Sequence, residues 1–128
     1  MATQVVFAPM LIIPNGITDV SFYTRAFGAE ELRRFSNDDG TIHVVELSMG
    51  GAMFHIHEQW ETKLVSPQKA GASTVSVNIF VEDVDTVVEQ AVAAGAKITS
   101  PVQDFDYGLR QGDIIDPFGH CWQIQKKI

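Results

Sequence analysis

The sequence has few basic residues and no long apolar run. Only 9 of its 128 residues are Lys or Arg, against 16 that are Asp or Glu, so the net charge is −7. Nucleic-acid binding typically relies on clustered basic side chains that neutralise phosphates, and an acidic surface is repelled by anionic lipid headgroups. No stretch approaches the roughly 20 apolar residues that span a bilayer. We therefore expect no nucleic-acid partner and no membrane association.

Cysteine is almost absent as well. The single residue Cys121 cannot form an intrachain disulfide, and Met1–Gln4 lacks the charged and then apolar layout of a signal peptide. Both features favour a reducing, cytoplasmic setting. Hydrophobic residues make up 45% of the chain, and its length is typical of one globular domain.

A weak internal repeat organises the chain. Met10–Ala29 and Asn78–Ala96 each contain an apolar run, a polar turn and a helical pattern that ends in Gly-Ala. In the first copy, Val5–Ile13 reads as a buried strand, and a helix capped by Asn15, Thr18 or Asp19 follows. Three strands are predicted after this helix, at Glu31–Phe35, Thr41–Met49 and Ala52–His57.

The second copy repeats this order. The strand Thr74–Val81 precedes a helix capped by Asp83, and three more strands are predicted at Lys97–Ser100, Arg110–Asp116 and Cys121–Lys126. Phe105–Gly112 is predicted as a loop. The tetrapeptide Asp116–Gly119 is a strong turn signal before the last strand.

The pattern predicts an α+β fold of two βαβββ modules in a single domain over residues 1–128. Module one covers about 5–60, a connector about 58–73 and module two about 74–126. A small sheet with helices on one face leaves its other face to be covered, or to form a concave cleft.

Two histidines are the most suggestive local feature. His55 and His57 alternate along a strand, so their imidazoles face the same side and could bind a divalent metal. Glu58, His43 or Glu46 would lie nearby. The alternative is a pair of histidines on a solvated sheet face. The sequence contains no nucleophile-elbow motif and no phosphate-binding glycine loop.

Polar residues within apolar strands mark a candidate pocket. Unpaired buried amides cost roughly 1–3 kcal/mol, so these residues either bond within the core or line a wet cleft. We favour the cleft and expect it to be lined by Ser76, Asn78, Tyr107, Arg110 and Trp122, with Gln123 beside them. Arg110 could pair with a ligand carboxylate, or with a surface carboxylate from Asp104, Asp106 or Asp113.

Taken together, the doubled pattern and several motifs resemble the vicinal oxygen chelate superfamily, which groups glyoxalase I, bleomycin-resistance proteins and ring-cleaving dioxygenases. Within it, the sequence is most similar to the branch labelled PhnB-like or glyoxalase-like. The similarity covers about Phe7 to Lys126, and its most specific parts are His43–Leu47, Phe80–Asp85, Ala93–Ala96, Tyr107–Arg110 and Asp116–Trp122.

The resemblance implies metal ligands on the first and last strands of each module. The aligned positions are Ala8, His55, Ser76 and Gln123, and the separation from Ala8 to Ser76 equals that from His55 to Gln123. Ala8 has no donor atom and Ser76 is a poor ligand. An atypical site would have to use His55, Gln123 and His57, with Asn78 in place of Ser76, for Zn, Ni, Fe or Mn.

Three functions stay open. The first is a metal-free cleft that binds or sequesters an aromatic or cationic small molecule. The second is a divergent metal-dependent lyase, isomerase or dioxygenase using His55, while true glyoxalase I activity is disfavoured because no aligned carboxylate is present. The third is an interaction module without a ligand. The resemblance also implies a homodimer whose clefts are shared between the chains.

Overall fold

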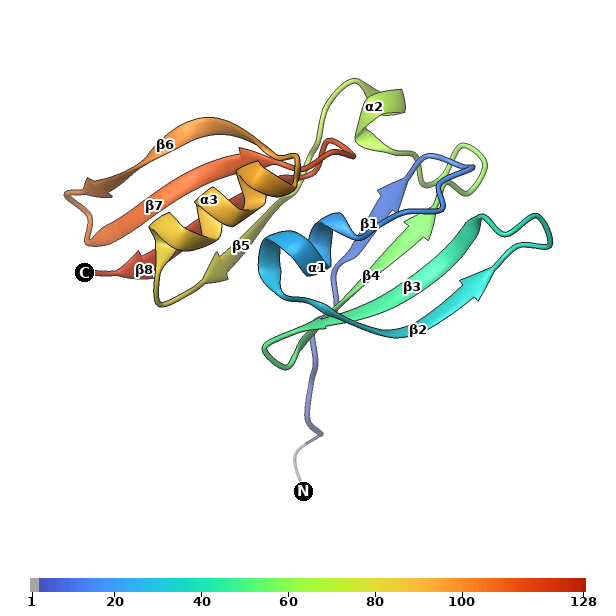
Figure 1. The fold of residues 1–128 in the computed structure, drawn as a ribbon, viewed down its shortest axis with the longest axis horizontal. Helices are drawn as coiled ribbons and strands as arrows, with labels where there is room; N and C mark the ends of the chain where they lie inside the picture. Colours follow the sequence, from blue (N-terminus) through green and yellow to red (C-terminus); the bar gives the residue numbers. More distant parts are fainter. Residues whose placement is uncertain (1–2) are drawn as a thin grey trace.

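The computed structural model describes residues 3–128 and contains two four-stranded sheets with helices packed on one side of them (Figure 1). The elements in chain order are β1 (Met10–Ile13), α1 (Phe22–Phe27), β2 (Glu30–Ser36), β3 (Ile42–Met49), β4 (Ala52–Glu58), α2 (Pro67–Ala70), β5 (Ser76–Phe80), α3 (Val84–Ala94), β6 (Lys97–Phe105), β7 (Leu109–Ile115) and β8 (Cys121–Lys127). None of these helices is long and apolar enough to cross a membrane.

The two sheets have the same topology. Their strand orders are β1-β4-β3-β2 and β5-β8-β7-β6, and in each the first strand runs parallel to the last strand of the same module. The remaining neighbours are antiparallel. This repetition confirms the predicted α+β fold of two βαβββ modules.

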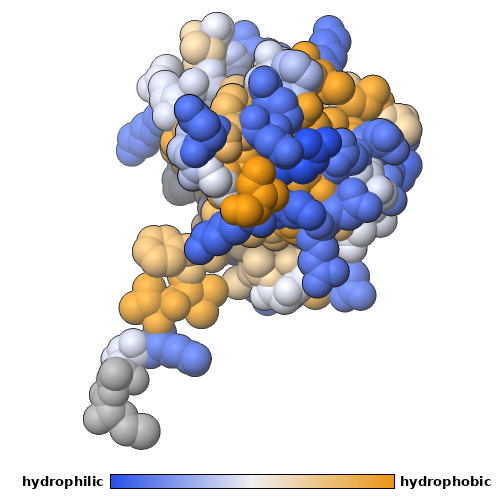
Figure 2. Space-filling model, turned by 90° about the vertical axis from the view of Figure 1, so that its left-hand side faces the viewer, coloured by the Kyte–Doolittle hydropathy of each residue, from blue (hydrophilic) through white to orange (hydrophobic). Residues whose placement is uncertain are grey.

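Several boundaries differ from the sequence prediction. The first strand begins at Met10 rather than Val5, because only residues from Met10 onward have a strand partner, β4. The apolar residues before it leave the body of the molecule as an exposed arm, and Phe7 is 88% exposed (Figures 1 and 2). The prediction failed here because an apolar pattern indicates that residues are buried, but it does not identify the strand or side chains that bury them.

The helices also bring corrections. Helix α1 starts after Ser21, later than predicted, and Asp19 accepts a hydrogen bond from the Ser21 amide instead of capping the helix. The predicted cap of α3 is confirmed, since the Asp83 carboxylate accepts from the Thr86 amide. In the second module β6 continues to Phe105, which shortens the predicted 105–112 loop to a turn before Leu109.

One apolar core extends through both modules. Helices α1 and α3 pack against each other. From α1, Tyr23 and Phe27 contact Trp122 of β8, with ring centroids 6.0 and 4.7 Å from the indole. The modules of one chain are therefore joined through their helices and the helix-facing sides of the sheets.

A buried carboxylate fixes this junction. Asp116, at the start of the predicted turn, is only 4% exposed and accepts four hydrogen bonds. The Tyr23 hydroxyl and the Trp122 indole donate to Oδ2 over 2.6 and 3.0 Å, and the amides of Phe118 and His120 donate to Oδ1 over 2.9 and 3.0 Å. The bond from Tyr23 crosses from module one to module two.

A second polar contact supports the same junction. The His120 ring nitrogen Nε2 donates to the Ile12 carbonyl of β1 over 2.7 Å. The turn itself depends on Gly119, whose φ is +90°, because a Cβ there would lie 2.9 Å from the Pro67 side chain. The predicted Asp116–Gly119 turn is thus confirmed, and it also anchors one module to the other.

We predict that Tyr23→Phe lowers the free energy of unfolding by about 1–3 kcal/mol, because it removes a buried hydrogen bond to a carboxylate. The measurement is the urea midpoint at unchanged m-value. The matched control is Tyr107→Phe, which removes a hydroxyl from a side chain that is 59% exposed. Equal midpoints for the two variants would contradict a structural role of the Tyr23–Asp116 bond.

We also predict a loss of stability at high pH. Burial raises the pKa of Tyr23 well above its ordinary value, and the Asp116 carboxylate raises it further by repelling the phenolate and binding the hydroxyl. The unfolded tyrosine loses its proton near pH 10 while the folded one keeps it, so this stabilisation is complete below pH 10 and decreases above it, by at most about 1.4 kcal/mol per pH unit. Alkaline unfolding curves of the protein and Tyr23→Phe test this, and an equally steep decline in both would refute it.

Candidate functional site

Each sheet has one face that the helices leave uncovered. In β4, Phe54 and Ile56 point into the core, so the alternation of the strand puts Met53, His55 and His57 on the opposite face. We call this the open face of module one. In β8, Trp122 and Ile124 are in the core, and the opposite face, the open face of module two, carries Cys121, Gln123 and Gln125.

The strand register defines the centre of each open face. His55 lies opposite Met10 of β1, and Gln123 lies opposite Asn78 of β5. Corresponding positions of the two modules are therefore equally separated in the sequence, as the repeat predicts. The strand partners of His55 and Gln123 are Met10 and Asn78, whereas the sequence analysis assigned Ala8 and Ser76 to these positions. Ala8 precedes β1, and the Ser76 hydroxyl donates to the Asn78 side-chain oxygen over 3.1 Å.

Two buried polar atoms on the open faces have no hydrogen-bond partner within residues 3–128. They are Nε2 of His55 and Oδ1 of Asp113. Asp113 lies opposite Gln123 in the β7–β8 pair, which puts it on the open face of module two. Because an unsatisfied buried group costs roughly 1–3 kcal/mol, each of these atoms calls for a partner such as an ordered water, an ion or a bound molecule.

Asp113 was missed as a site residue by the sequence analysis, which considered it only as a surface partner for Arg110. The alternation of Gln111, Asp113 and Ile115 along one predicted strand could have placed Asp113 on the same face as these two residues. What the spacing could not supply was the register that places Asp113 beside Gln123.

A groove with largely apolar walls separates the modules. It has a volume of about 520 Å³ and is bounded by the β3–β4 turn on one side and by β5 and α3 on the other, with Phe27, Met49, Asn78, Phe80 and Val87 in its lining. A smaller hollow of about 150 Å³ adjoins it and is lined by Phe7, Met53, Phe54, Asn78 and Trp122, among others. Asn78 belongs to both and is the polar residue at their junction.

Other predicted binding residues lie elsewhere. Arg110 bonds both oxygens of Asp85, over 2.8 and 3.0 Å, and also Asp104 over 2.9 Å. These bonds raise the pKa of Arg110 and lower the pKa of Asp85, so the guanidinium is occupied by its own chain. Of the predicted surface partners, Asp104 is confirmed. Tyr107 stacks on Phe105 at the β6–β7 turn. Trp122 is a core residue, 1% exposed, that also lines the smaller hollow.

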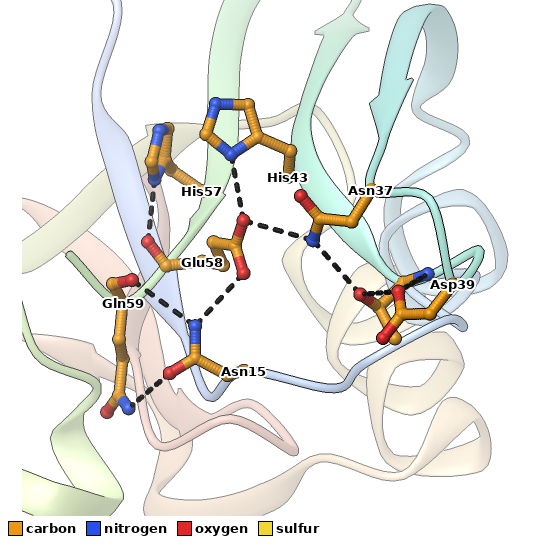
Figure 3. Close-up of polar contacts among 8 residues, drawn as sticks. Asn15, Asn37, Asp39, His43, His57, Glu58 and Gln59 are labelled. Carbon is orange, nitrogen blue, oxygen red and sulfur yellow. Dashed lines mark hydrogen bonds and ion pairs between the residues drawn. The ribbon is translucent and has the colours of Figure 1, made fainter.

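Glu58 organises a polar cluster at the end of β4 (Figure 3). Its carboxylate accepts hydrogen bonds from the side chains of Asn15, Asn37 and His43 over 3.0, 3.1 and 2.8 Å. Burial raises the pKa of Glu58, but these three donors outweigh it and bring the pKa below the ordinary value. The carboxylate thereby ties the β1–α1 loop and the β2–β3 turn to β4.

His57 belongs to this cluster rather than to the surroundings of His55. Its Nδ1 lies 2.6 Å from the Glu58 carbonyl oxygen, and its ring centroid is 4.8 Å from that of His43. Of the predicted combination, His55 and Gln123 lie at the centres of two different open faces, opposite Met10 and Asn78 respectively.

These residues do not form a catalytic metal site within one chain. His55 has the Met10 thioether and the Arg33-paired carboxylate of Glu46 beside it, while Gln123, Asn78 and Asp113 lie in the other sheet. A catalytic site in this class of chemistry needs about three good ligands and an open position. No group of three or more His, Cys, Asp and Glu side chains in the described part of the chain is arranged to hold a metal ion. We derive no metal-dependent step at this position.

The chain is similar to several proteins that span nearly its whole length. An uncharacterized protein of Mycobacterium bovis is 29% identical over 125 residues, which cover 94% of this chain and 82% of the relative. The crystal structure of TioX from Micromonospora sp. ML1 is 29% identical with a TM-score of 0.70 and covers 95% of this chain and 99% of its own.

A more distant match shows the fold alone. The genomically encoded fosfomycin resistance protein FosX from Listeria monocytogenes has a TM-score of 0.72 at 17% identity, over 99% of this chain and 96% of its own. The family model described as the Glyoxalase/Bleomycin resistance protein/Dioxygenase superfamily matches residues 18–124. The protein belongs to this superfamily.

Proposed function

We propose that this protein binds or sequesters an aromatic or cationic small molecule in a cleft formed by its open sheet faces, without a complete metal site. The observation that carries the proposal is the pair of unpartnered buried atoms, His55 Nε2 and Asp113 Oδ1, one on each open face. Each lacks a partner within residues 3–128, so each would gain a hydrogen bond if a bound molecule displaced the side chains that cover it.

The chemistry of the open faces supports this ligand class. The buried Asp113 oxygen favours a hydrogen-bond donor that carries positive charge, in keeping with the overall charge of −7. Exposed aromatic side chains are available for stacking, since Phe80 of β5 is 61% exposed and Phe35 of β2 is 51% exposed. The amide of Asn78, at the junction of groove and hollow, would orient a ligand through directed hydrogen bonds.

We further propose that the complete cleft forms in a homodimer, with the open face of module one in one chain opposite the open face of module two in the other. Within one chain, His55 and Gln123 lie in different sheets. Strands β1 and β5 each have a free edge, and the arm before β1 exposes Val5, Val6 and Phe7. Pairing with a second copy would bury these apolar residues and cover the open faces.

The second candidate is a divergent metal-dependent lyase, isomerase or dioxygenase that uses His55. The observation that favours it is the free Nε2 of His55, an ordinary metal ligand. The residues around His55 weaken it, because Met10 offers only a thioether and the Glu46 carboxylate opposite His55 is paired with Arg33. We therefore place the binding function first.

We predict that a panel of flat aromatic cations and their neutral analogues contains compounds that raise the melting temperature of the protein. His55→Ala and Asn78→Ala should each weaken the binding of such a compound by about 10-fold, since each removes a polar contact. Titration calorimetry measures the loss, and the control is Thr24→Ala on the exposed side of α1. A panel that shifts nothing, or equal affinities in all three variants, would refute the proposal.

We predict that Asp113→Asn has opposite effects on stability and binding. Replacing a carboxylate that has an unpaired buried oxygen should leave the free energy of unfolding unchanged or raise it by about 1 kcal/mol, while the affinity for cationic compounds falls. Asp106→Asn removes the same charge from an exposed turn and serves as the control. A marked loss of stability, with cation affinity retained, would show that Asp113 has a structural role instead.

A further inference from the structure

The histidine cluster at the end of β4 contains features that the small-molecule cleft does not use. His43 of β3 and His57 of β4 lie in neighbouring strands, because Val44 is the register partner of His57. The two rings are 4.8 Å apart between centroids and inclined by 62°. The indole of Trp60 stacks over His57, 6.3 Å away and inclined by 16°.

Both imidazoles are held in the same way by their Nδ1 atoms. His43 Nδ1 bonds the Glu58 carboxylate over 2.8 Å, and His57 Nδ1 bonds the Glu58 carbonyl oxygen over 2.6 Å. When Nδ1 carries the proton for these acceptors, Nε2 of each ring keeps a free lone pair. Figure 3 shows both Nε2 atoms on the side of the rings away from Glu58.

This arrangement is the one that metal-binding histidines use. A metal-ligating imidazole almost always donates its other nitrogen to a carboxylate or a backbone carbonyl, which fixes the tautomer and the ring orientation. Two imidazoles that share an ion through nitrogen at about 2.0–2.1 Å have ring centroids roughly 5 Å apart. The observed 4.8 Å matches that separation.

Space for an ion and further ligands is present beside the rings. A cavity of about 530 Å³ is lined by His43, His57, Glu58, Gln59, Trp60 and Glu61. Glu61 has a φ of +53° and is the only residue other than glycine with positive φ within residues 3–128, which is an unusual backbone conformation next to the cavity. Its carboxylate adds negative charge to the lining.

We propose that His43 and His57 form a two-histidine site for a divalent transition-metal ion, held by both Nε2 atoms. Glu58 positions the two rings and is not a ligand itself, because its carboxylate and carbonyl oxygens are bound to their Nδ1 atoms. Two protein ligands leave the other coordination positions to water or to a donor group of a bound molecule. Imidazole donors favour Cu²⁺, Ni²⁺ and Zn²⁺ over Mg²⁺ or Ca²⁺.

The site lies at the end of β4, at the edge of the open face of module one and away from its centre at His55. His57 and His55 are two residues apart along β4, which is about 7 Å. His55 carries the unpartnered Nε2 of the open face, whereas His57 is engaged in the Glu58 cluster. His43 bonds Glu58 and belongs to the cluster alone, so His43→Gln should lose metal binding and keep the binding of aromatic cations. This variant distinguishes a failure of the metal site from a failure of the cleft.

The test is calorimetric titration of tag-free protein with Ni²⁺ and Zn²⁺, with Mg²⁺ as the negative control. We expect one ion per chain for Ni²⁺ and Zn²⁺ and no heat for Mg²⁺. His43→Gln and His57→Gln should each weaken Ni²⁺ binding at least 10-fold, and Glu58→Gln should weaken it by about 10–100-fold. The control Thr24→Ala, on the exposed side of α1, should retain the affinity of the unmodified protein.

A second measurement uses the unmodified protein, so it does not require any variant to fold. Long-range proton–nitrogen spectra of the histidine rings report which nitrogen is perturbed, and Zn²⁺ should shift Nε2 of His43 and His57 while leaving His120 unchanged. Absence of binding at millimolar Zn²⁺ would overturn the proposal. So would Ni²⁺ affinity that survives unchanged in both His43→Gln and His57→Gln, since the ion would then bind elsewhere.

Discussion

The Asp116 carboxylate is the interaction on which the arrangement of the two modules depends. It is buried and accepts four hydrogen bonds, from Tyr23 in module one and from Trp122 and two turn amides in module two. Burying a carboxylate is costly unless hydrogen bonds compensate it, and here four donors do so. The bond from Tyr23 fixes α1 against β8 and thereby the position of one sheet relative to the other.

This junction determines which sheet faces remain available. Because α1 and α3 pack on each other and fill the core on one side, the opposite faces of both sheets carry no helix. His55 and Asp113 lie on these faces with buried atoms that no residue of the described chain satisfies. The groove that contains Asn78 lies between the same two modules. Fold and candidate cleft thus have one cause.

The two histidines of β4 differ because their cross-strand neighbours differ. Alternation along β4 puts His55 and His57 on one face, and the sequence alone treats them as equivalent. Their cross-strand surroundings differ, because His55 lies opposite Met10 and Glu46, while His57 meets His43 and the carbonyl oxygen of Glu58. One ring is left with a free nitrogen on the open face, and the other is fixed within a cluster at the strand end.

The sequence by itself determined the duplicated βαβββ order, the Asp83 cap and the Asp116–Gly119 turn, because these depend on periodicity and on contacts within a few residues. Only the tertiary structure decided that Met10 and Asn78 face His55 and Gln123, that Arg110 is held by Asp85 and Asp104, and that Asp113 is left without a partner. The reason is physical: strand register and long-range ion pairs join residues far apart in the chain, and their choice depends on how the whole core packs rather than on any local pattern.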